Sequence, residues 1–208
     1  MAIKAILFNA EMVRAILEGR KSCTRKIVKP QQLIGMLPDK CKNGAPEKFL
    51  KEKKLMFKPY CDMTDIELIN TAYKAPYQPG DILYVRETWK KAPNGYYYYE
   101  DWQRNDIADV TKWKPSIHMP KEAARIWLKV TDVRVERLQE MSAESALAEG
   151  ADKYIHTNGG LDENVTITSF IGIWNSTIKK SDIDRYGWDA NPYVWIIEFE
   201  RCEKPEGV

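Results

Sequence analysis

Residues 19–25, with the sequence Gly-Arg-Lys-Ser-Cys-Thr-Arg, place a lysine, two hydroxyls and a thiol within one short turn. A hydroxyl is a poor nucleophile unless a base takes its proton, and a lysine among cations in a partly desolvated loop can have its pKa lowered into that role. The spacing of Lys21 and Thr24 therefore indicates an amine that activates a threonine hydroxyl. In a simpler interpretation, Arg20 and Lys21 stabilise the C-terminus of the preceding helix, where the helix dipole favours positive charge.

A short amphipathic helix is expected directly before this turn. Asn9 can act as its N-cap, apolar residues repeat behind it at helical spacing, and Gly19 is the expected left-handed stop. A strand is expected directly after the turn, at residues 24–28. Cys23 is expected to be an inward-packed small side chain, which is the more frequent situation of a lone cysteine.

Hydrophobic periodicity predicts both strands and helices along the rest of the chain. Strands are expected at residues 3–8, 82–85, 126–135 and 195–199. The third of these strands should contain a bulge or bend, and the last should be half-buried because its apolar residues alternate with glutamates. One helix is expected to begin after Ser142 and end at Glu149 and Gly150, and another to lie around residues 170–178.

Two stretches interrupt this core, at about residues 31–79 and 91–112. Proline and glycine punctuate the first stretch, whereas tyrosine and tryptophan are frequent in the second. The chain of 208 residues is long enough for one well-cored domain, residues 1–208, that carries both insertions.

The composition is that of an ordinary soluble protein, with 30% charged and 44% hydrophobic residues. The sequence lacks the ~18–20 apolar residues of a membrane span and the apolar core of a signal peptide, so we expect a cytoplasmic protein without a membrane partner. The four cysteines form no C-x-x-C pair and there are two histidines, which predicts reduced thiols, no metal site and no cofactor.

Positive charge is concentrated on the N-terminal side of the sequence. Residues 1–58 carry 14 basic and 5 acidic side chains, whereas residues 59–208 carry 18 basic and 25 acidic ones. A basic segment beside aromatic residues is typical of a protein that binds a polyanion, most often nucleic acid. The lysines of residues 40–58 could equally belong to a solvated insertion without a partner.

Four blocks of the sequence resemble the ASCH family, named for activating signal cointegrator homology. The blocks are the first helix with residues 19–25, residues 79–88 (Pro-Gly-Asp-Ile-Leu-Tyr-Val-Arg-Glu-Thr), residues 128–133 (Leu-Lys-Val-Thr-Asp-Val) and residues 148–150 (Ala-Glu-Gly). The chain is most similar to the longer ASCH proteins of bacteriophages and prophages, which it also resembles at residues 113–120 and 191–195. The resemblance implies an α+β protein, a PUA-like β-barrel with flanking helices and a cleft for nucleic acid or a nucleoside, encoded by a bacterium or a phage.

Small bacterial ASCH proteins are amidohydrolases that remove the acetyl group from N4-acetylcytidine with a lysine, a threonine and a glutamate. Position by position, the resemblance places these residues at Lys21, Thr24 and Glu149. Thr24 would be the nucleophile, Lys21 the base and then a proton donor, and Glu149 the group that orients the lysine or protonates the leaving amine. A glutamate at a helix end is also common as an exposed side chain without a role.

Six further residues are candidates for binding substrate or nucleic acid: Arg20, Arg25, Arg86, Glu87, Trp89 and His118. Arg86 and Glu87 could instead form an ion pair within the fold, and His118 could be a structural hydrogen-bonding residue. The tyrosines at positions 96–99 either stack on bases or cover the barrel.

Three classes of function remain open. The first is an amidohydrolase that acts on an N4-acylated cytidine or a similar modified base, with ribonuclease activity as a variant. The second is a non-catalytic RNA- or DNA-binding module that recognises a modified or unpaired base, with RNA the first expectation. The third is a scaffold in phage assembly or host interaction.

The enzyme hypothesis carries two structural expectations. Lys21, Thr24 and Glu149 should converge at a small pocket with aromatic or aliphatic walls. The mouth of this pocket should have a positive potential, produced by Arg20, Lys21, Arg25 and Arg86.

Overall fold

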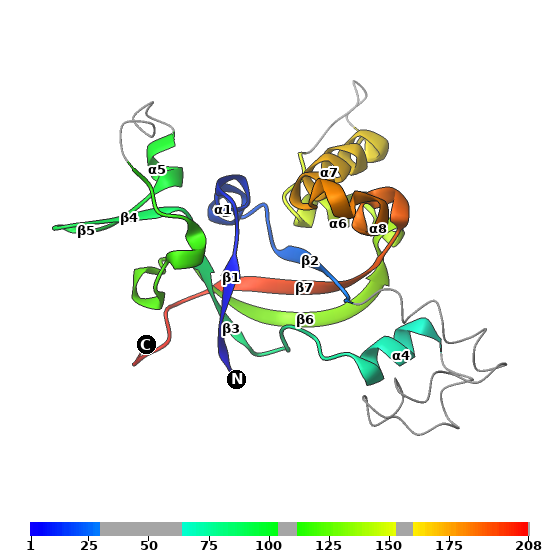
Figure 1. The fold of residues 1–208 in the computed structure, drawn as a ribbon, viewed down its shortest axis with the longest axis horizontal. Helices are drawn as coiled ribbons and strands as arrows, with labels where there is room; N and C mark the ends of the chain where they lie inside the picture. The colour runs from blue at the N-terminus through cyan, green and yellow to red at the C-terminus, as the bar shows by residue number, and fades with distance from the viewer. Residues whose placement is uncertain (30–63, 104–111, 153–159, 208) are drawn as a thin grey trace.

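The computed structural model describes residues 1–29, 64–103, 112–152 and 160–207. Helices and strands are interspersed along the chain, which confirms the α+β class (Figure 1). Most of the first predicted insertion, residues 30–63, and part of the second, residues 104–111, lie outside the described residues. The organisation of residues 1–208 as one domain with two insertions stays a prediction.

Five strands form one mixed sheet in the order β1-β3-β6-β7-β2. Their bounds are β1 Ile3–Leu7, β3 Ile82–Arg86, β6 Trp127–Arg137, β7 Tyr193–Cys202 and β2 Cys23–Ile27. β1 and β3 are parallel, and the other neighbouring strands are antiparallel. The long strands β6 and β7 curve strongly (Figure 1). In the described pairings the edge strands β1 and β2 do not bond to each other, so the barrel-like sheet is open between them.

One face of the sheet packs against α1 (Ala10–Leu17) and forms the main core. None of its central residues is more than 4% exposed: Ile6, Val13, Ile16, Val85, Leu128, Val130, Ile197 and Phe199. Burial of each such side chain stabilises the fold by roughly 1.5–3 kcal/mol. The register of β6 against β7 shifts between Val130 and Asp132, which confirms the predicted bulge.

The opposite face of β7 is covered by α6 (Ala143–Ala148) and α7 (Glu163–Thr177). Val194 and Ile196 of β7 have no solvent exposure, and they pack in one cluster with Phe170 and Trp174 of α7. The prediction of a half-buried last strand is therefore wrong for its first half. Both faces of that half are covered, so its sequence is a continuous apolar run and not an alternation.

The aromatic-rich second stretch forms a β-hairpin and a short helix beside α1. Its elements are β4 (Trp89–Ala92), β5 (Gly95–Tyr98) and α5 (Tyr99–Gln103). An ion pair between Arg14 of α1 and Glu100 of α5, with Nε 2.6 Å from Oε1, joins this hairpin region to the main core.

Two more helices complete the described fold, α4 (Asp65–Ala72) and α8 (Ile183–Tyr186). Thr64 and Glu67 form a capping box at the start of α4, and Ile69 of this helix reaches the main core. Within the described ranges, no helix has the length and apolar character needed to cross a membrane.

Candidate active site

The end of α1 turns the chain so that Lys21 points inward. Asn9 caps the start of α1, because its Oδ1 accepts a backbone N–H of the first turn at 2.8 Å. At the other end Gly19 has φ +74°, and the N–H groups of Gly19 and Arg20 bond to carbonyls of the last turn at 3.1 and 2.8 Å. This is a Schellman arrangement, and it confirms Gly19 as the left-handed stop of the helix.

The segment that follows α6 lies directly against this turn. The N–H of Ser22 donates to the last carbonyl of α6 at 2.9 Å, which places the backbone of Glu149 beside that of Lys21. Gly150 has φ +92°, and a Cβ at this position would lie 3.0 Å from the Cβ of Ala15. Both the backbone conformation and the close approach of α1 therefore favour glycine here.

Lys21 and Glu149 form a buried ion pair, although 128 positions separate them in the sequence. The Lys21 Nζ donates to Glu149 Oε2 at 2.7 Å, to the Glu149 carbonyl at 2.8 Å and to the Cys23 carbonyl at 2.7 Å. These contacts use all three donors of an ammonium group, and the lysine side chain has no solvent exposure. The structure thus brings together two of the three predicted catalytic residues.

Arg25 is a second cation on the same carboxylate. Its Nη1 lies 3.2 Å from Glu149 Oε1, its Nη2 donates to Ser145 Oγ at 2.9 Å, and its guanidinium lies 5.8 Å from the centroid of the Phe170 ring. Lys21, Arg25 and Glu149, which we name the Glu149 cluster, combine two buried cations with one anion. Loss of the carboxylate would leave both cations buried without compensation, which is strongly unfavourable.

Thr24 lies on β2 next to this cluster. The Ser22 carbonyl and the Val28 N–H bond to β7 at 2.9 and 3.0 Å. In an antiparallel pair, even-numbered residues of β2 therefore direct their backbone groups at β7, and odd-numbered ones direct theirs at the open edge. The Cys23 carbonyl accordingly faces away from β7, where Lys21 donates to it.

A cavity of about 300 Å³ lies beside Thr24, which is 6% exposed. Thr24, Arg25 and Glu149 are among its polar lining residues, while α1, α7 and the end of β1 supply apolar walls. These apolar walls include Phe8, Met12, Phe170, Ile173 and Trp174. The expected small pocket with aromatic and aliphatic walls is therefore present, and Thr24 and Glu149 line it, whereas Lys21 lines neither cavity and reaches the pocket only through its contact with Glu149.

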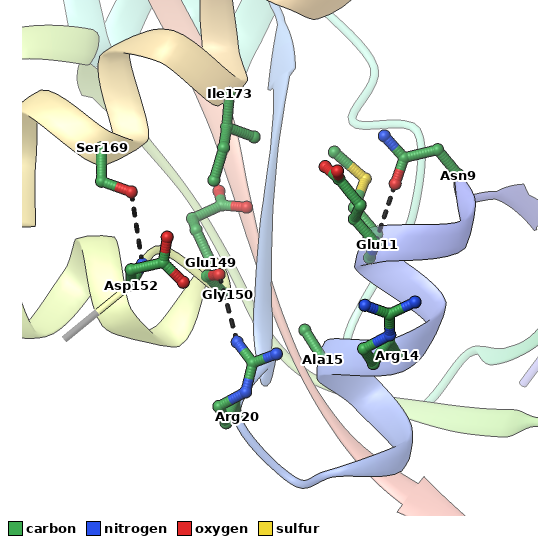
Figure 2. A pocket seen from close by; sticks show the side chains of 11 residues that line it. Asn9, Glu11, Arg14, Ala15, Arg20, Glu149, Gly150, Asp152, Ser169 and Ile173 are labelled. Carbon is green, nitrogen blue, oxygen red and sulfur yellow. Dashed lines mark hydrogen bonds between the residues drawn. The ribbon is translucent and has the colours of Figure 1, made fainter. Parts of the chain in front are cut away.

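A second cavity, of about 240 Å³, shares Asn9, Met12, Glu149 and Ile173 with the first. Figure 2 shows this second cavity, with Glu149 between α1 and α7. We name the two cavities together the α1–α7 cleft, because α1 lines one side and α7 the other.

Charged residues of both signs lie at the mouth of the cleft, where a positive potential was expected. Acidic residues line the second cavity beside basic ones, namely Glu11, Glu149 and Asp152 with Arg14 and Arg20. Lys21 and Arg25 are buried against Glu149, and the Arg20 Nη2 lies 2.8 Å from a carboxylate oxygen of Glu18. Carboxylates contact these three cations, a pairing that sequence position alone did not reveal, and the positive potential of the mouth stays a prediction.

Arg86, Glu87, Trp89 and His118 do not line either cavity. Arg86 donates to the Ile117 carbonyl at 3.2 Å and lies over the Tyr84 ring, while His118 is exposed on a 3₁₀ turn. The structure therefore does not bring these four residues to the predicted catalytic group.

Glu87 and Trp89 are both buried, at 2% and 4% exposure. The Glu87 carboxylate accepts two hydrogen bonds from Arg125, each at 2.9 Å. Burial raises the pKa of Glu87, and Arg125 opposes this rise. The open alternative of an ion pair within the fold thus holds for Glu87, with Arg125 as its partner in place of Arg86.

Cys23 is 3% exposed and packs in the cluster beneath α6 and α7. Burial raises the pKa of its thiol to about 12, so the reactive thiolate is disfavoured. This agrees with the expected packed side chain. No group of histidine, cysteine and carboxylate residues suited to a metal ion occurs in the described part of the chain.

Sequence reasoning missed several residues of the cleft, among them Phe170, Trp174 and Lys26. Phe170 and Trp174 were expected only as the apolar face of a helix, yet they also line the cavity. Lys26, another lining residue, was not considered. The sequence did contain a signal that Lys26 shares the site with Thr24. Residues two apart on a strand share a face, and Lys26 follows Thr24 by two positions.

No protein-family model and no curated protein matches the chain. Among solved structures it is similar to an ASCH domain from Lactobacillus crispatus JV V101, with 10% sequence identity, a TM-score of 0.39, and coverage of 96% of this chain and 79% of that chain. At this TM-score the match adds no argument about the site. The family that it names is the ASCH family, which is also the family that the four sequence blocks resemble.

Proposed function

We propose that the α1–α7 cleft binds a modified cytidine and that Lys21, Thr24 and Glu149 remove its N4-acyl group. One observation carries the proposal. A buried ion pair of 2.7 Å between Lys21 and Glu149 borders a cavity that Thr24 lines and that aromatic side chains wall. A few convergent polar groups in a concave, largely apolar site are a frequent sign of a binding or active site.

The cavity suits a planar base. Phe8, Phe170 and Trp174 offer flat apolar surfaces, and Thr24 and Glu149 offer polar groups at one side of the space. Aromatic walls with a few convergent polar groups can orient a pyrimidine so that its exocyclic amide meets the hydroxyl.

The chemistry divides among the three residues. The Thr24 Oγ1 attacks the acyl carbonyl, the bond to the cytosine nitrogen breaks, and the acyl group becomes an ester on Thr24. The leaving nitrogen takes a proton from Glu149, and water then hydrolyses the ester. Lys21 becomes a base by passing a proton to Glu149 along their 2.7 Å hydrogen bond, after which its neutral amine accepts the Thr24 proton.

A second function is favoured by a different observation. All three Lys21 donors are bonded within the protein, so Lys21 must release one acceptor before it can serve Thr24. If the Glu149 cluster keeps this arrangement, it forms part of the wall of the cleft and takes no part in a reaction. The protein would then be a binding module for a modified or unpaired base, in RNA above all, without chemistry.

Turnover of N4-acetylcytidine, free and within RNA, decides between the two functions. Thr24→Val keeps shape and removes the attacking oxygen, so we expect kcat/KM to fall by ~10² or more with little change in affinity. Thr168→Val is the matched control, because this hydroxyl is exposed on α7 and bonds to the Asn164 carbonyl. Undiminished hydrolysis in Thr24→Val would contradict the nucleophile assignment, and binding without turnover by wild type would favour the binding module.

A further inference from the structure

Lys26 is a cation of the α1–α7 cleft that the proposed chemistry does not use. It lies two residues after Thr24 on β2, and both residues line the 300 Å³ cavity. Side chains two apart leave the same face of a strand, with Cα atoms on the order of 7 Å apart. Thr24 and Lys26 therefore lie at neighbouring points along one wall of the cavity.

Lys26 lacks an acidic partner. Among the described residues no carboxylate lies within ion-pair distance of its amine, which instead lies over the Tyr77 ring, 5.2 Å from the centroid. Lys21 and Lys4 differ in this respect, since their Nζ atoms lie 2.7 and 2.6 Å from Glu149 and Asp81. Burial lowers the pKa of the Lys26 amine, the direction expected when no anion offsets desolvation.

A half-buried cation that lines a cavity without an anion offers a binding point for an anionic ligand, because such a ligand would offset the cost of its burial. Glu149, the carboxylate among the residues that line this cavity, is already bonded to Lys21 and Arg25. We propose that Lys26 binds a phosphate of the ligand, so that the site takes a cytidine nucleotide or a phosphate of RNA in preference to a free nucleoside. This proposal rests on the proposed function, because the anionic group of an N4-acetylated cytidine nucleotide is its phosphate.

The placement of the two side chains fits this ligand class. If the acyl group of the base is at Thr24, the phosphate must lie elsewhere in the cavity, and Lys26 is a lining cation two residues farther along β2. A lysine ammonium is a compact charge with three donors, and it meets phosphate without requiring a fixed bidentate geometry.

Binding of cytidine and of cytidine 5′-monophosphate tests the proposal by titration. We expect wild type to bind the monophosphate about tenfold or more tightly, which corresponds to one charge-assisted contact. Lys26→Met should reduce this ratio to near one, and Lys26→Arg, which keeps the charge, should retain most of it. Lys29→Met is the matched control, because Lys29 is exposed, lines neither cavity and lies over the Tyr186 ring.

Equal affinity of wild type for the two ligands, or an unchanged ratio in Lys26→Met, overturns the phosphate site. Melting temperatures show that each variant is folded, and the ratio removes effects common to both ligands. A pentanucleotide of RNA distinguishes the source of the phosphate. Tighter binding than the monophosphate, lost in Lys26→Met, assigns it to RNA, whereas equal or weaker binding assigns it to a mononucleotide.

Turnover of N4-acetylcytidine and of its 5′-monophosphate separates this proposal from the proposed function. Turnover of both at equal kcat/KM overturns the phosphate site and supports the hydrolase. A Lys26-dependent preference for cytidine monophosphate without turnover supports the phosphate site and overturns the hydrolase. Absence of binding to any of these ligands overturns both.

Discussion

Glu149 and Glu87 are both buried glutamates that an arginine contacts, and their surroundings differ. Glu149 is 6% exposed and contacts two cations, Lys21 and Arg25. Glu87 is 2% exposed and shares Arg125 with a second carboxylate, that of Asp101. We name Glu87, Arg125 and Asp101 the Glu87 cluster. The Glu149 cluster has an excess of one positive charge, and the Glu87 cluster an excess of one negative charge.

The larger difference between the two clusters is whether a cavity lies beside the glutamate. Glu149 lines both cavities of the α1–α7 cleft, beside the Thr24 hydroxyl. The Glu87 cluster lines neither cavity, and its arginine packs over the Tyr98 ring, 4.1 Å from the centroid, joining the end of β3 to the hairpin region. A buried ion pair is therefore weak evidence for chemistry by itself. A cavity and a hydroxyl beside it are what make one of the two clusters a candidate site.

Parallel substitutions at the two glutamates give the largest expected effect. In Glu149→Gln we expect kcat/KM on an N4-acylated cytidine to fall by ~10² or more, because the proton donor to the leaving nitrogen is lost. We also expect the free energy of unfolding to fall by about 3 kcal/mol, since two buried cations lose their anion. Urea unfolding and turnover per folded molecule measure the two effects.

Glu87→Gln is the matched variant. Its amide keeps one acceptor for Arg125, Arg125 keeps Asp101 as an anion, and burial raises the pKa of Glu87, so loss of this charge should cost less than loss of the Glu149 charge. We expect turnover per folded molecule to be unchanged and the free energy of unfolding to change by less than about 1 kcal/mol. Equal losses of turnover in the two variants would show that the clusters do not differ in function.

The contact between Gly150 and α1 gives an intermediate effect. Gly150→Ala should lower the free energy of unfolding by roughly 1–3 kcal/mol, because φ is +92° and the new Cβ meets the Ala15 Cβ at 3.0 Å. It should also lower turnover, because relief of the close contact with Ala15 would shift the segment that holds Glu149 against Lys21. Gly172→Ala in α7 meets no atom within 4 Å and should stabilise the protein by up to about 1 kcal/mol. Equal melting temperatures for the two alanine variants would contradict this strain argument.

The sequence predicted those parts of the fold whose signals are local. α1 was predicted from Asn9 and Gly19, and both caps form as expected. The bulge of β6 was predicted from a change of alternation within one strand. The cover over the second face of β7 was not predictable, because it depends on where α7 packs and not on the strand itself.

In the candidate site, too, the contacts between residues distant in sequence could not be predicted from local signals. The approach of Lys21 to Glu149 came from the family resemblance, since nothing in a separation of 128 positions indicates a contact. Arg25 was expected to bind phosphate, whereas it is buried on Glu149, a partner that only the folded chain supplies. Glu87 and Arg125 are likewise 38 positions apart, and no local pattern pairs them.

The pH dependence of stability gives the smallest effect and sharpens the difference between the two clusters. Burial raises the pKa of Glu87 above its ordinary 4.5, against the opposing effect of Arg125. A carboxyl with a higher pKa in the folded than in the unfolded protein contributes stability that is present below the unfolded value and is lost as pH rises through the folded value. The amide of Glu87→Gln does not titrate, so this variant is free of that loss.

We therefore expect the free energy of unfolding of wild type to fall relative to that of Glu87→Gln as pH rises from about 4.5 toward neutrality. Urea unfolding at several pH values measures the difference between the two proteins. Glu203→Gln, at an exposed position of the C-terminal segment, reports the general effect of removing one negative charge. The difference in unfolding free energy between wild type and Glu87→Gln could instead stay constant with pH, or follow the difference measured for Glu203→Gln. Either result would show that the fold does not favour the neutral form of the Glu87 carboxyl over its charged form. The two clusters would then differ in net charge and in the cavity beside Glu149, and the burial of Glu87 would not set it apart.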